Sequence, residues 1–343
     1  MKILAIDVGQ GTQDNLIYDS EKNEENFIKA VFPSPSKDFA DRLSRTEGEV
    51  FVCGSQIGGG EFSHALVERA KRHSVFITEE CAYTIRNDLS EVSDMGLRIV
   101  EEQPSDFAGI VLHISEPDLD TIGHIMNRFG EGDPEAVAVA VQDHGTYPKG
   151  QSNRKERLRR IREKLEADRE LSSLLFESGE IPDCYTRMHS AEKKVRGAFP
   201  KSRMFVMDTA IAAIAGCAVD KEARDRMLAI NLGNGHTMCA AIENGRVAGM
   251  FEHHTRKLDG EKLGKLVHGF ISHTLTDDDV FSDGGHGCFY LSDFGEPETI
   301  VVTGPNRRIA ESSSLKFRYA YPAGDTMMSG PAGMISVIKE KFY

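Results

Sequence analysis

The chain contains 343 residues, of which 40% are hydrophobic and 28% are charged, as in an ordinary globular protein. Its 54 acidic residues outnumber its 41 Lys and Arg residues, so the formal net charge is -13. This charge excludes a global attraction to nucleic acid or to an anionic membrane, and the length predicts roughly two domains.

The six cysteines are scattered along the chain and include no C-x-x-C pair. Their spacing is typical of reduced thiols and not of a disulfide scaffold or a zinc finger. The N-terminal apolar run is short and broken by Asp7, so no signal peptide is expected. No apolar stretch approaches the length of a membrane span, which is about 18 residues or more. We therefore expect a cytoplasmic protein with neither a membrane nor a nucleic acid as its partner.

The first half of the chain alternates short apolar runs with helical patterns. Residues 2–8 and 12–19 flank Gly9 and Gly11 and predict a β-hairpin, to which residues 27–32 add a third strand. Strands that alternate with helices indicate an α/β domain with a partly parallel sheet. Further buried strands are predicted at 50–54, 74–78, 109–115 and 136–143, with helices at 61–73 and 118–130.

Residues 153–177 are rich in Arg and Lys, with Leu158, Ile161 and Leu165 at helical spacing. This pattern predicts an amphipathic helix with a solvated basic face. A basic patch for an anionic partner is the alternative.

The pattern restarts after Pro200. An apolar strand at 203–208 leads into a small-residue helix at 209–219, and residues 227–255 predict a three-stranded meander. Asn244-Gly245 within the meander is a strong hairpin signal. The remaining predicted elements are a helix at 259–273, a strand, turn and helix start at 299–310, and a final helix within 323–342.

One sequence motif occurs twice, at 3–19 and at 228–243, and consists of an apolar strand, a Gly-x-Gly turn and a polar strand. Such a turn lets backbone N–H groups approach a phosphate closely. Asp7, at the end of the first strand, can hold Mg²⁺ through water. A plain hairpin is the alternative for either turn taken alone. The two turns together could clamp a polyphosphate through Gly9, Gln10, Gly11, Thr12, Gly233, Asn234 and Gly235.

The order of these motifs resembles that of the actin, Hsp70 and sugar-kinase superfamily of two-lobed, ATP-dependent proteins. Residues 3–19 and 228–243 are similar to its two phosphate motifs. Three further segments are similar to its adenosine motif and its two connecting helices, namely 300–310, 206–218 and 323–338.

This resemblance implies an α/β fold of two ribonuclease-H-like lobes around a central nucleotide cleft, the actin-like ATPase fold. The first lobe would span residues 1–205 and the second residues 206–343. Mg²⁺ and ATP would be the cofactors. The resemblance implies that Asp7 and Asn231 organise Mg²⁺ and that Gly304 packs against the nucleoside.

The sequence departs from the superfamily pattern at two positions. Asn231 stands where the second phosphate motif usually has Asp, and an amide contributes no negative charge to a metal site. Pro305 follows Gly304 where the adenosine motif usually has a second glycine. Both departures bear on metal affinity and on nucleotide choice.

Three short segments are similar to a narrower archaeal family of unknown function: IDVGQGTQD near the N-terminus, VQDHG at 141–145 and FEHHT at 251–255. Members of that family are labelled pyruvate formate-lyase activating enzymes. An activating enzyme of the radical type needs three closely spaced cysteines to hold an iron–sulfur cluster. The nearest two cysteines here are Cys217 and Cys239, so the sequence argues against that label.

The reaction depends on a general base. Asp208-Thr209-Ala210 resembles the Asp-containing segment that supplies the base in the hexokinase-like branch, although an Asp before an Ala-rich helix is also a favoured N-cap. Asp143 and His144 end the predicted strand 136–143 and are the other candidates, with a polar strand end as the alternative. The leading hypothesis is a phosphotransferase that uses ATP and Mg²⁺ on a small-molecule substrate. The alternatives are an ATPase switch that acts on a partner protein, and a ligand-binding protein without catalysis.

Two glycine-rich segments carry weaker hypotheses. Residues 57–60 open the predicted helix 61–73 and form either an anion site or a plain loop. His254, His286 and Cys288 could form a transition-metal site, although a loop on the substrate side is the alternative.

Overall fold

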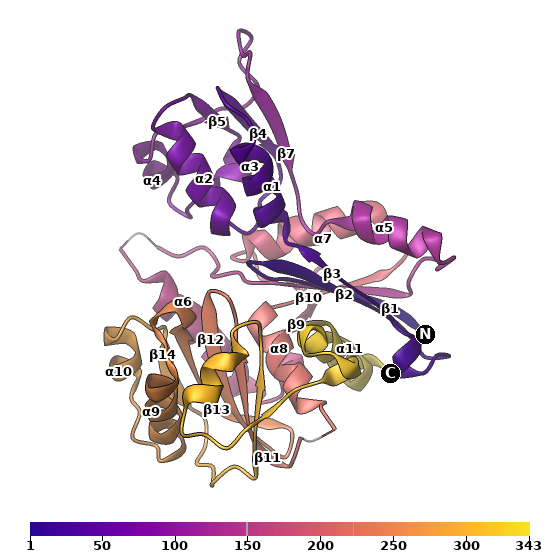
Figure 1. Cartoon of the computed structure of the whole chain (residues 1–343), viewed down its shortest axis with the longest axis vertical. Coiled ribbons are helices and arrows are strands. Elements are labelled where there is room, and N and C mark those ends of the chain that lie inside the picture. The colour runs from indigo at the N-terminus through magenta and orange to yellow at the C-terminus, as the bar shows by residue number, and fades with distance from the viewer. Residues whose placement is uncertain (149, 222) are drawn as a thin grey trace.

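The structure is a computed structural model that describes residues 1–148, 150–221 and 223–343. The first lobe is built on a six-stranded sheet of order β3-β2-β1-β8-β10-β9 (Figure 1). Strands β1 to β3 form an antiparallel meander, and β8 and β10 run parallel to β1. These strands are β1 (Lys2–Val8), β2 (Thr12–Asp19), β3 (Ile28–Pro33), β8 (Ala136–Val141), β9 (Leu175–Glu177) and β10 (Arg203–Met207).

The second lobe repeats this plan in a six-stranded sheet of order β14-β13-β12-β11-β15-β16. Again the first three strands form an antiparallel meander, and β15 runs parallel to β11. Five strands of each sheet, a meander followed by two parallel strands, have the same order, and this confirms the predicted fold of two ribonuclease-H-like lobes. The strands are β11 (Arg226–Leu232), β12 (His236–Glu243), β13 (Arg246–His254), β14 (Gly287–Tyr290), β15 (Thr299–Thr303) and β16 (Arg318–Tyr319).

A third body, at the top of Figure 1, is inserted between β3 and β8. Its four-stranded parallel sheet has the order β6-β5-β4-β7 and encloses a hydrophobic core of its own. The sequence predicted three of these strands but not their separation from the sheet of the first lobe. The elements are α1 (Pro35–Ser44), β4 (Val50–Gly54), α2 (Gly60–Ala70), β5 (Val75–Ile77), α3 (Glu79–Ala82), α4 (Leu89–Asp94), β6 (Leu97–Ile99) and β7 (Ile110–Ile114).

The helices outside this body cover the two large sheets. The helix α6 buries Leu158, Ile161 and Leu165, as predicted, in a core that also contains residues of the second lobe. Its exposed Arg159 and Arg162 pair with glutamates one turn away on the same helix, which favours the solvated basic face. These helices are α5 (Leu119–Arg128), α6 (Asn153–Ala167), α7 (Thr186–Ala198), α8 (Thr209–Ala218), α9 (Gly260–Ile271), α10 (Asp277–Ser282) and α11 (Ser329–Phe342). Short 3₁₀ helices lie at Glu24–Asn26, Leu171–Leu174, Thr255–Lys257, Arg307–Ser312, Pro322–Gly324 and Thr326–Met328.

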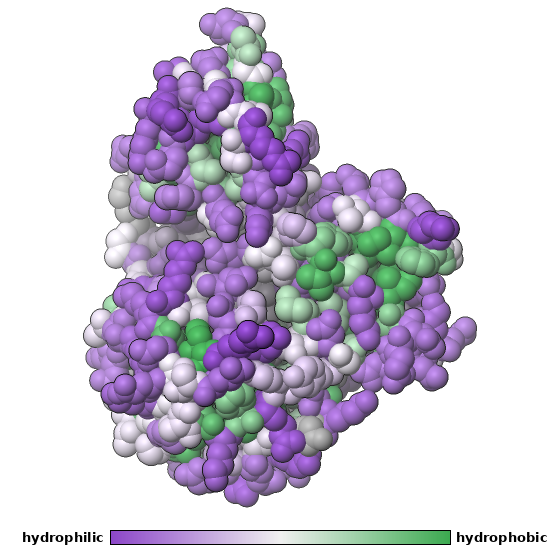
Figure 2. All heavy atoms as spheres, in the orientation of Figure 1, coloured by the Kyte–Doolittle hydropathy of each residue, from purple (hydrophilic) through white to green (hydrophobic). Residues whose placement is uncertain are grey.

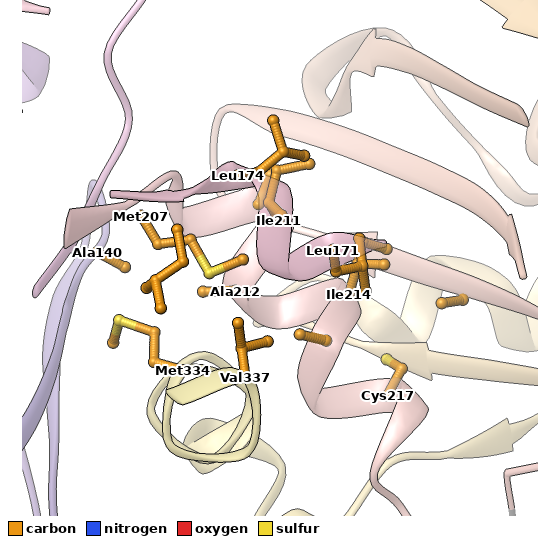
Figure 3. Packing of buried hydrophobic residues seen from close by; sticks show 14 of the residues in the cluster. Ala140, Leu171, Leu174, Met207, Ile211, Ala212, Ile214, Cys217, Met334 and Val337 are labelled. Carbon is orange, nitrogen blue, oxygen red and sulfur yellow. The ribbon is translucent and has the colours of Figure 1, made fainter. Parts of the chain in front are cut away.

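Helices α8 and α11 cross between the lobes at very short range. A Cβ atom on Gly216 would lie 2.0 Å from the backbone oxygen of Ser329, and one on Gly333 would lie 2.1 Å from that of Ala212. Small residues therefore let the two backbones touch. Figure 3 shows Met334 of α11 within the buried hydrophobic cluster around this crossing.

We expect Gly333→Ala to lower the free energy of unfolding by about 1–3 kcal/mol, because the added methyl group would overlap the backbone of α8. Gly123→Ala on α5 is the matched control. No atom lies within 4 Å of a Cβ added there, so alanine should raise stability by roughly 0.5–1 kcal/mol. Thermal unfolding measures both changes. If the two variants shift the thermal midpoint in the same direction, the close crossing of α8 and α11 is contradicted.

The surface seen in Figure 2 is mostly hydrophilic, in keeping with the acidic composition. Hydrophobic residues on this face gather mainly beside the first sheet and α11. Within the described ranges, the helices include none whose length and apolar content would let it cross a membrane.

Candidate active-site cleft

A cavity of about 490 Å³ lies where the two lobes and the inserted body meet. Its walls include both Gly-x-Gly turns, the end of β8, the start of α2 and the first residues of α8 and α11. Of the residues predicted to hold the cation, the phosphates and the nucleoside or to act as the base, all but Gly11 and Asp208 line this cavity. The sequence therefore predicted most of one continuous wall from segments that are far apart in the chain.

The two Gly-x-Gly turns have the same hydrogen-bonding pattern. The N–H of Gly9 donates to the carbonyl oxygen of Thr12 at 2.9 Å, and the N–H of Gly233 donates to that of His236 at 2.9 Å. Both glycines therefore close their turns, and their N–H groups are not available to a phosphate.

The middle residues of the two turns face each other across the cleft. A Cβ atom on Gly11 would lie 2.6 Å from Nδ2 of Asn234, and one on Gly235 would lie 3.1 Å from Oε1 of Gln10. The hydrogen bonds found in the described parts of the chain use none of the N–H groups of these four residues. Four backbone N–H groups without a hydrogen bond among the described residues, two from each lobe, therefore lie in two turns that approach each other, and closely spaced backbone N–H groups of this kind can bind an anion.

Two buried carboxylates lie side by side next to the first turn. Asp7 and Asp14 are directly paired in the hairpin β1–β2, so their side chains share one face of the sheet. Burial raises the pKa of Asp7 to about 7 and that of Asp14 to about 8, and the charge of Asp7 adds to the second shift. Oδ1 of Asp14 has no hydrogen-bond partner within the described residues. An acidic pair with an orphaned oxygen fits a hard divalent cation.

Both connecting helices hold Asp7 in place. The hydroxyl of Thr209, at the start of α8, donates to Oδ1 of Asp7 at 2.6 Å. At the start of α11, a Cβ atom on Gly330 would lie 2.0 Å from Oδ2 of Asp7, so only glycine fits. A shift of either helix would therefore displace the carboxylate of Asp7.

Asn231 occupies the same place in β11 that Asp7 occupies in β1, one residue before the strand ends. Its side chain is buried on the cleft wall. Gly304 follows β15 with a φ of 96°, and a Cβ atom there would lie 2.4 Å from the carbonyl oxygen of Leu232. Close packing against the end of β11 therefore requires this glycine, whatever its role toward a nucleoside.

Asp208 performs the capping role that was one of its two predicted roles. Its Oδ1 accepts hydrogen bonds from the N–H groups of Ala210 and Ile211 in the first turn of α8. Both of its oxygens also accept hydrogen bonds from the Arg157 guanidinium, at 2.6 and 2.9 Å. Asp208 is buried, and it is not among the residues that line the cleft.

Arg157 lies in a buried group of charges that no sequence pattern predicted. Besides Asp208, its guanidinium contacts Glu252 of β13, at 3.0 Å. Burial raises the pKa of Glu252, but the positive charge of Arg157 outweighs this and holds it well below its usual value. The three side chains join α6, α8 and β13, and they lie directly behind the cleft.

Asp143 lies on the cleft wall and is held by backbone groups. Its Oδ1 accepts from the N–H of Gly145, and its Oδ2 accepts from the N–H groups of Arg187 and Met188. Burial raises the pKa of Asp143, and these hydrogen bonds oppose the rise. The cleft therefore contains a carboxylate of increased basicity at this position.

A second buried ion pair forms the wall near Asp143. Arg187 contacts Glu116 through Nε and donates to the carbonyl oxygen of Gln142 at 2.8 Å. Glu116 also accepts the N–H of Gly58 at 3.0 Å, so a carboxylate of the protein already occupies this donor of the predicted anion site at 57–60. No local motif could have identified Arg187, since its partners come from distant segments.

The metal site suggested for His254, His286 and Cys288 does not form. Cys288 lies in the core of the second lobe, and burial raises the pKa of its thiol to about 12. His286 instead joins His144 and His236, and this is the group of three metal-ligating side chains found among the described residues.

A family model with the description "Putative pyruvate format-lyase activating enzyme (DUF1786)" matches residues 57–309. The match covers more than half of the chain, so the chain belongs to this family. The narrower resemblance suggested by the sequence is thereby confirmed. None of the curated proteins matches this sequence.

The described cysteines do not fit the activity in that family description. All six are free, and four of them are buried. The group of three metal-ligating side chains among the described residues contains histidines and no cysteine. A cysteine-ligated iron–sulfur cluster therefore has no ligand set in the part of the chain that the structure describes.

Three solved structures are similar to this chain over almost its full length. The "Lmo2764 protein, a putative N-acetylmannosamine kinase, from Listeria monocytogenes" has 10% identity and a TM-score of 0.38, with 100% of both chains covered. A Bacteroides thetaiotaomicron protein with actin-like ATPase fold and unknown function has 9% identity and a TM-score of 0.36, with 96% of this chain and 95% of that chain covered. MreB5 of Spiroplasma citri bound to ADP has 13% identity and a TM-score of 0.38, with 99% and 96% covered.

Proposed function

We propose that the protein binds ATP with Mg²⁺ in the cleft and transfers the terminal phosphoryl group to a small-molecule acceptor. The observation that carries this proposal is the pair of closely approaching turns, in which the N–H groups of Gln10, Gly11, Asn234 and Gly235 make no hydrogen bond among the described residues. A polyphosphate is the class of ligand that such a two-sided nest accepts.

Asp7, Asp14 and Asn231 would hold the cation. Asp14 was not predicted, and its unpartnered oxygen supports a cation position that the two carboxylates share. Mg²⁺ supplies charge neutralisation for the phosphates when it is bound. The turns hold the phosphate chain, and the Thr12 hydroxyl on the cleft wall adds a donor.

We assign the base to Asp143 rather than to Asp208. Asp143 lines the cleft, and its raised pKa makes it a stronger proton acceptor. Asp208 binds the guanidinium of Arg157 with both oxygens and does not line the cleft, so its carboxylate is not in position to contact an acceptor there. In this assignment, Asp143 accepts a proton from the acceptor hydroxyl while the neighbouring cleft wall excludes water.

Thermal unfolding with Mg²⁺ and ATP tests nucleotide binding. A ligand at about a hundred times its Kd stabilises a protein by about 2.7 kcal/mol, which is a rise of several degrees here. We expect this rise for the wild type and its loss in Asp7→Asn. Asp94→Asn is the control, because Asp94 is an exposed residue of α4.

The phosphotransferase is distinguished from an ATPase switch by turnover. Production of ADP that requires an added hydroxyl compound supports transfer, whereas slow hydrolysis without an acceptor supports the switch. If ATP and ADP both leave the thermal midpoint of the wild type unchanged, nucleotide binding is refuted, and with it both activities.

A further inference from the structure

Three histidines from distant parts of the chain converge at one side of the cleft. His144 follows β8 of the first lobe, His236 begins β12 and His286 precedes β14. One ring nitrogen of each can be chosen so that the three lie within 4.8 Å of one another. His144 and His236 line the cleft, whereas His286 is only 1% exposed and lies behind them.

His286 has the environment of a buried metal ligand. Neither of its ring nitrogens makes a well-aligned hydrogen bond within the described residues, although the site has almost no access to solvent. Its Nδ1 lies 3.1 Å from Oε2 of Glu252. A carboxylate behind one ring nitrogen is the usual support for a histidine that binds a metal through the other.

His236 has comparable support from a polar neighbour. The amide nitrogen Nε2 of Gln142 lies 2.8 Å from Nδ1 of His236, so in this orientation the amide donates to the ring. A half-turn of the amide exchanges its nitrogen and oxygen; with the oxygen at the ring, Nδ1 would donate to it and Nε2 of His236 would keep its lone pair for a ligand.

The charged side chains next to the three histidines carry a net negative charge, which favours the binding of a cation there. Asp208 and Glu252 carry two negative charges, and Arg157 neutralises one of them.

We propose that His144, His236 and His286 bind one divalent transition-metal ion, such as Zn²⁺ or Fe²⁺, with an open coordination position toward the cleft. Three imidazole nitrogens suit such ions, and a site with three protein ligands has room for a small-molecule oxygen or water.

This metal site is separate from the cation position at Asp7 and Asp14. Carboxylates suit a hard ion such as Mg²⁺, whereas imidazole nitrogens suit a softer one. The histidine site goes beyond the proposed phosphotransferase and does not depend on nucleotide binding. It places a Lewis acid on the wall that also carries Asp143, where the acceptor would be activated.

The test measures metal binding without nucleotide. Protein stripped with a chelator is dialysed against Zn²⁺ and analysed for retained metal, and a second sample is titrated with Co²⁺ and followed by its visible absorption. We expect about one retained ion for each chain and a Co²⁺ spectrum of low-coordinate nitrogen ligation. His144→Gln and His236→Gln should each weaken metal binding at least about 100-fold.

His124→Gln is the matched control, because His124 is an exposed histidine of α5. It should bind metal as the wild type does. His144 and His236 are only half-buried, and circular dichroism without metal verifies that their variants fold. Absence of retained Zn²⁺ in the wild type would overturn the site, and so would wild-type affinity in a folded His236→Gln variant.

Discussion

Arg157→Met is expected to lower the free energy of unfolding by about 3–5 kcal/mol, because it leaves the carboxylates of Asp208 and Glu252 buried without a counter-charge. Methionine keeps much of the apolar volume of the arginine stem, so the loss reports charge and hydrogen bonding rather than a cavity. The thermal midpoint should fall by several degrees.

Arg159→Met is the matched control on the same helix. Arg159 is half-exposed and pairs with Glu156 and Glu163, and exposed pairs of this kind contribute only about 0–1 kcal/mol. A similar loss in the two variants would contradict the structural importance of the buried group.

A triple variant separates the cost of an unpaired charge from loss of packing. Arg157→Met combined with Asp208→Asn and Glu252→Gln removes all three charges, and asparagine can still cap α8. Replacing all members of a buried ion group by neutral residues often changes the free energy of unfolding only slightly, so the triple variant should regain much of the stability lost in Arg157→Met. If the triple variant is less stable than Arg157→Met alone, the carboxylates do more than balance Arg157.

The fold could be predicted where local patterns decide it. The hairpin 2–19 and the meander 227–255 are set by apolar runs and Gly turns, and their residues occupy those strands in the structure. The separate sheet of the inserted body was missed. Its strands have the same short β-branched pattern as β8, and sequence periodicity does not reveal which strands pair.

The candidate site, like the fold, could be predicted only where the signal is local in the sequence. Asp7 and the two turns follow from local sequence, and Asp14 could have been added from the hairpin register, which places it opposite Asp7. Arg157 and Arg187 could not have been found, because their carboxylate partners lie more than 40 residues away in sequence. A basic helix indicates solvated charge, and nothing local marks the one arginine that turns inward.

The stability of the metal-free protein should fall as pH rises from 6.5 to 8. Asp7 and Asp14 hold protons in the folded state up to pH values near 7 and 8, whereas unfolded Asp has lost its proton by pH 5 or so. The folded state therefore binds more protons than the unfolded state across this window, and stability decreases with pH. The two carboxyls together predict a loss of roughly 2 kcal/mol.

The histidines with lowered pKa values oppose this trend at the lower end of the window; they are His144, His236, His253 and His254. Their unfolded rings still lose protons around pH 6.5 whereas the folded rings hold fewer, so this contribution raises stability with pH and is nearly complete by about pH 7.5. Asp143 also has a raised pKa and acts in the same direction as the pair. Comparison with the double variant Asp7→Asn, Asp14→Asn removes this shared contribution and isolates the pair.

Mg²⁺ should reverse the loss, since a divalent cation binds the ionised pair and competes with protons for it. We expect the rise in thermal midpoint caused by Mg²⁺ to be largest at pH 8, small at pH 6 and absent from the double variant. Thermal scans of the wild type and the double variant at both pH values, with and without Mg²⁺, measure these changes in thermal midpoint. A rise that is equal at the two pH values would place the cation away from Asp7 and Asp14. A pH profile without Mg²⁺ that matches the profile of the double variant would show that the two carboxyls are not protonated in the folded protein.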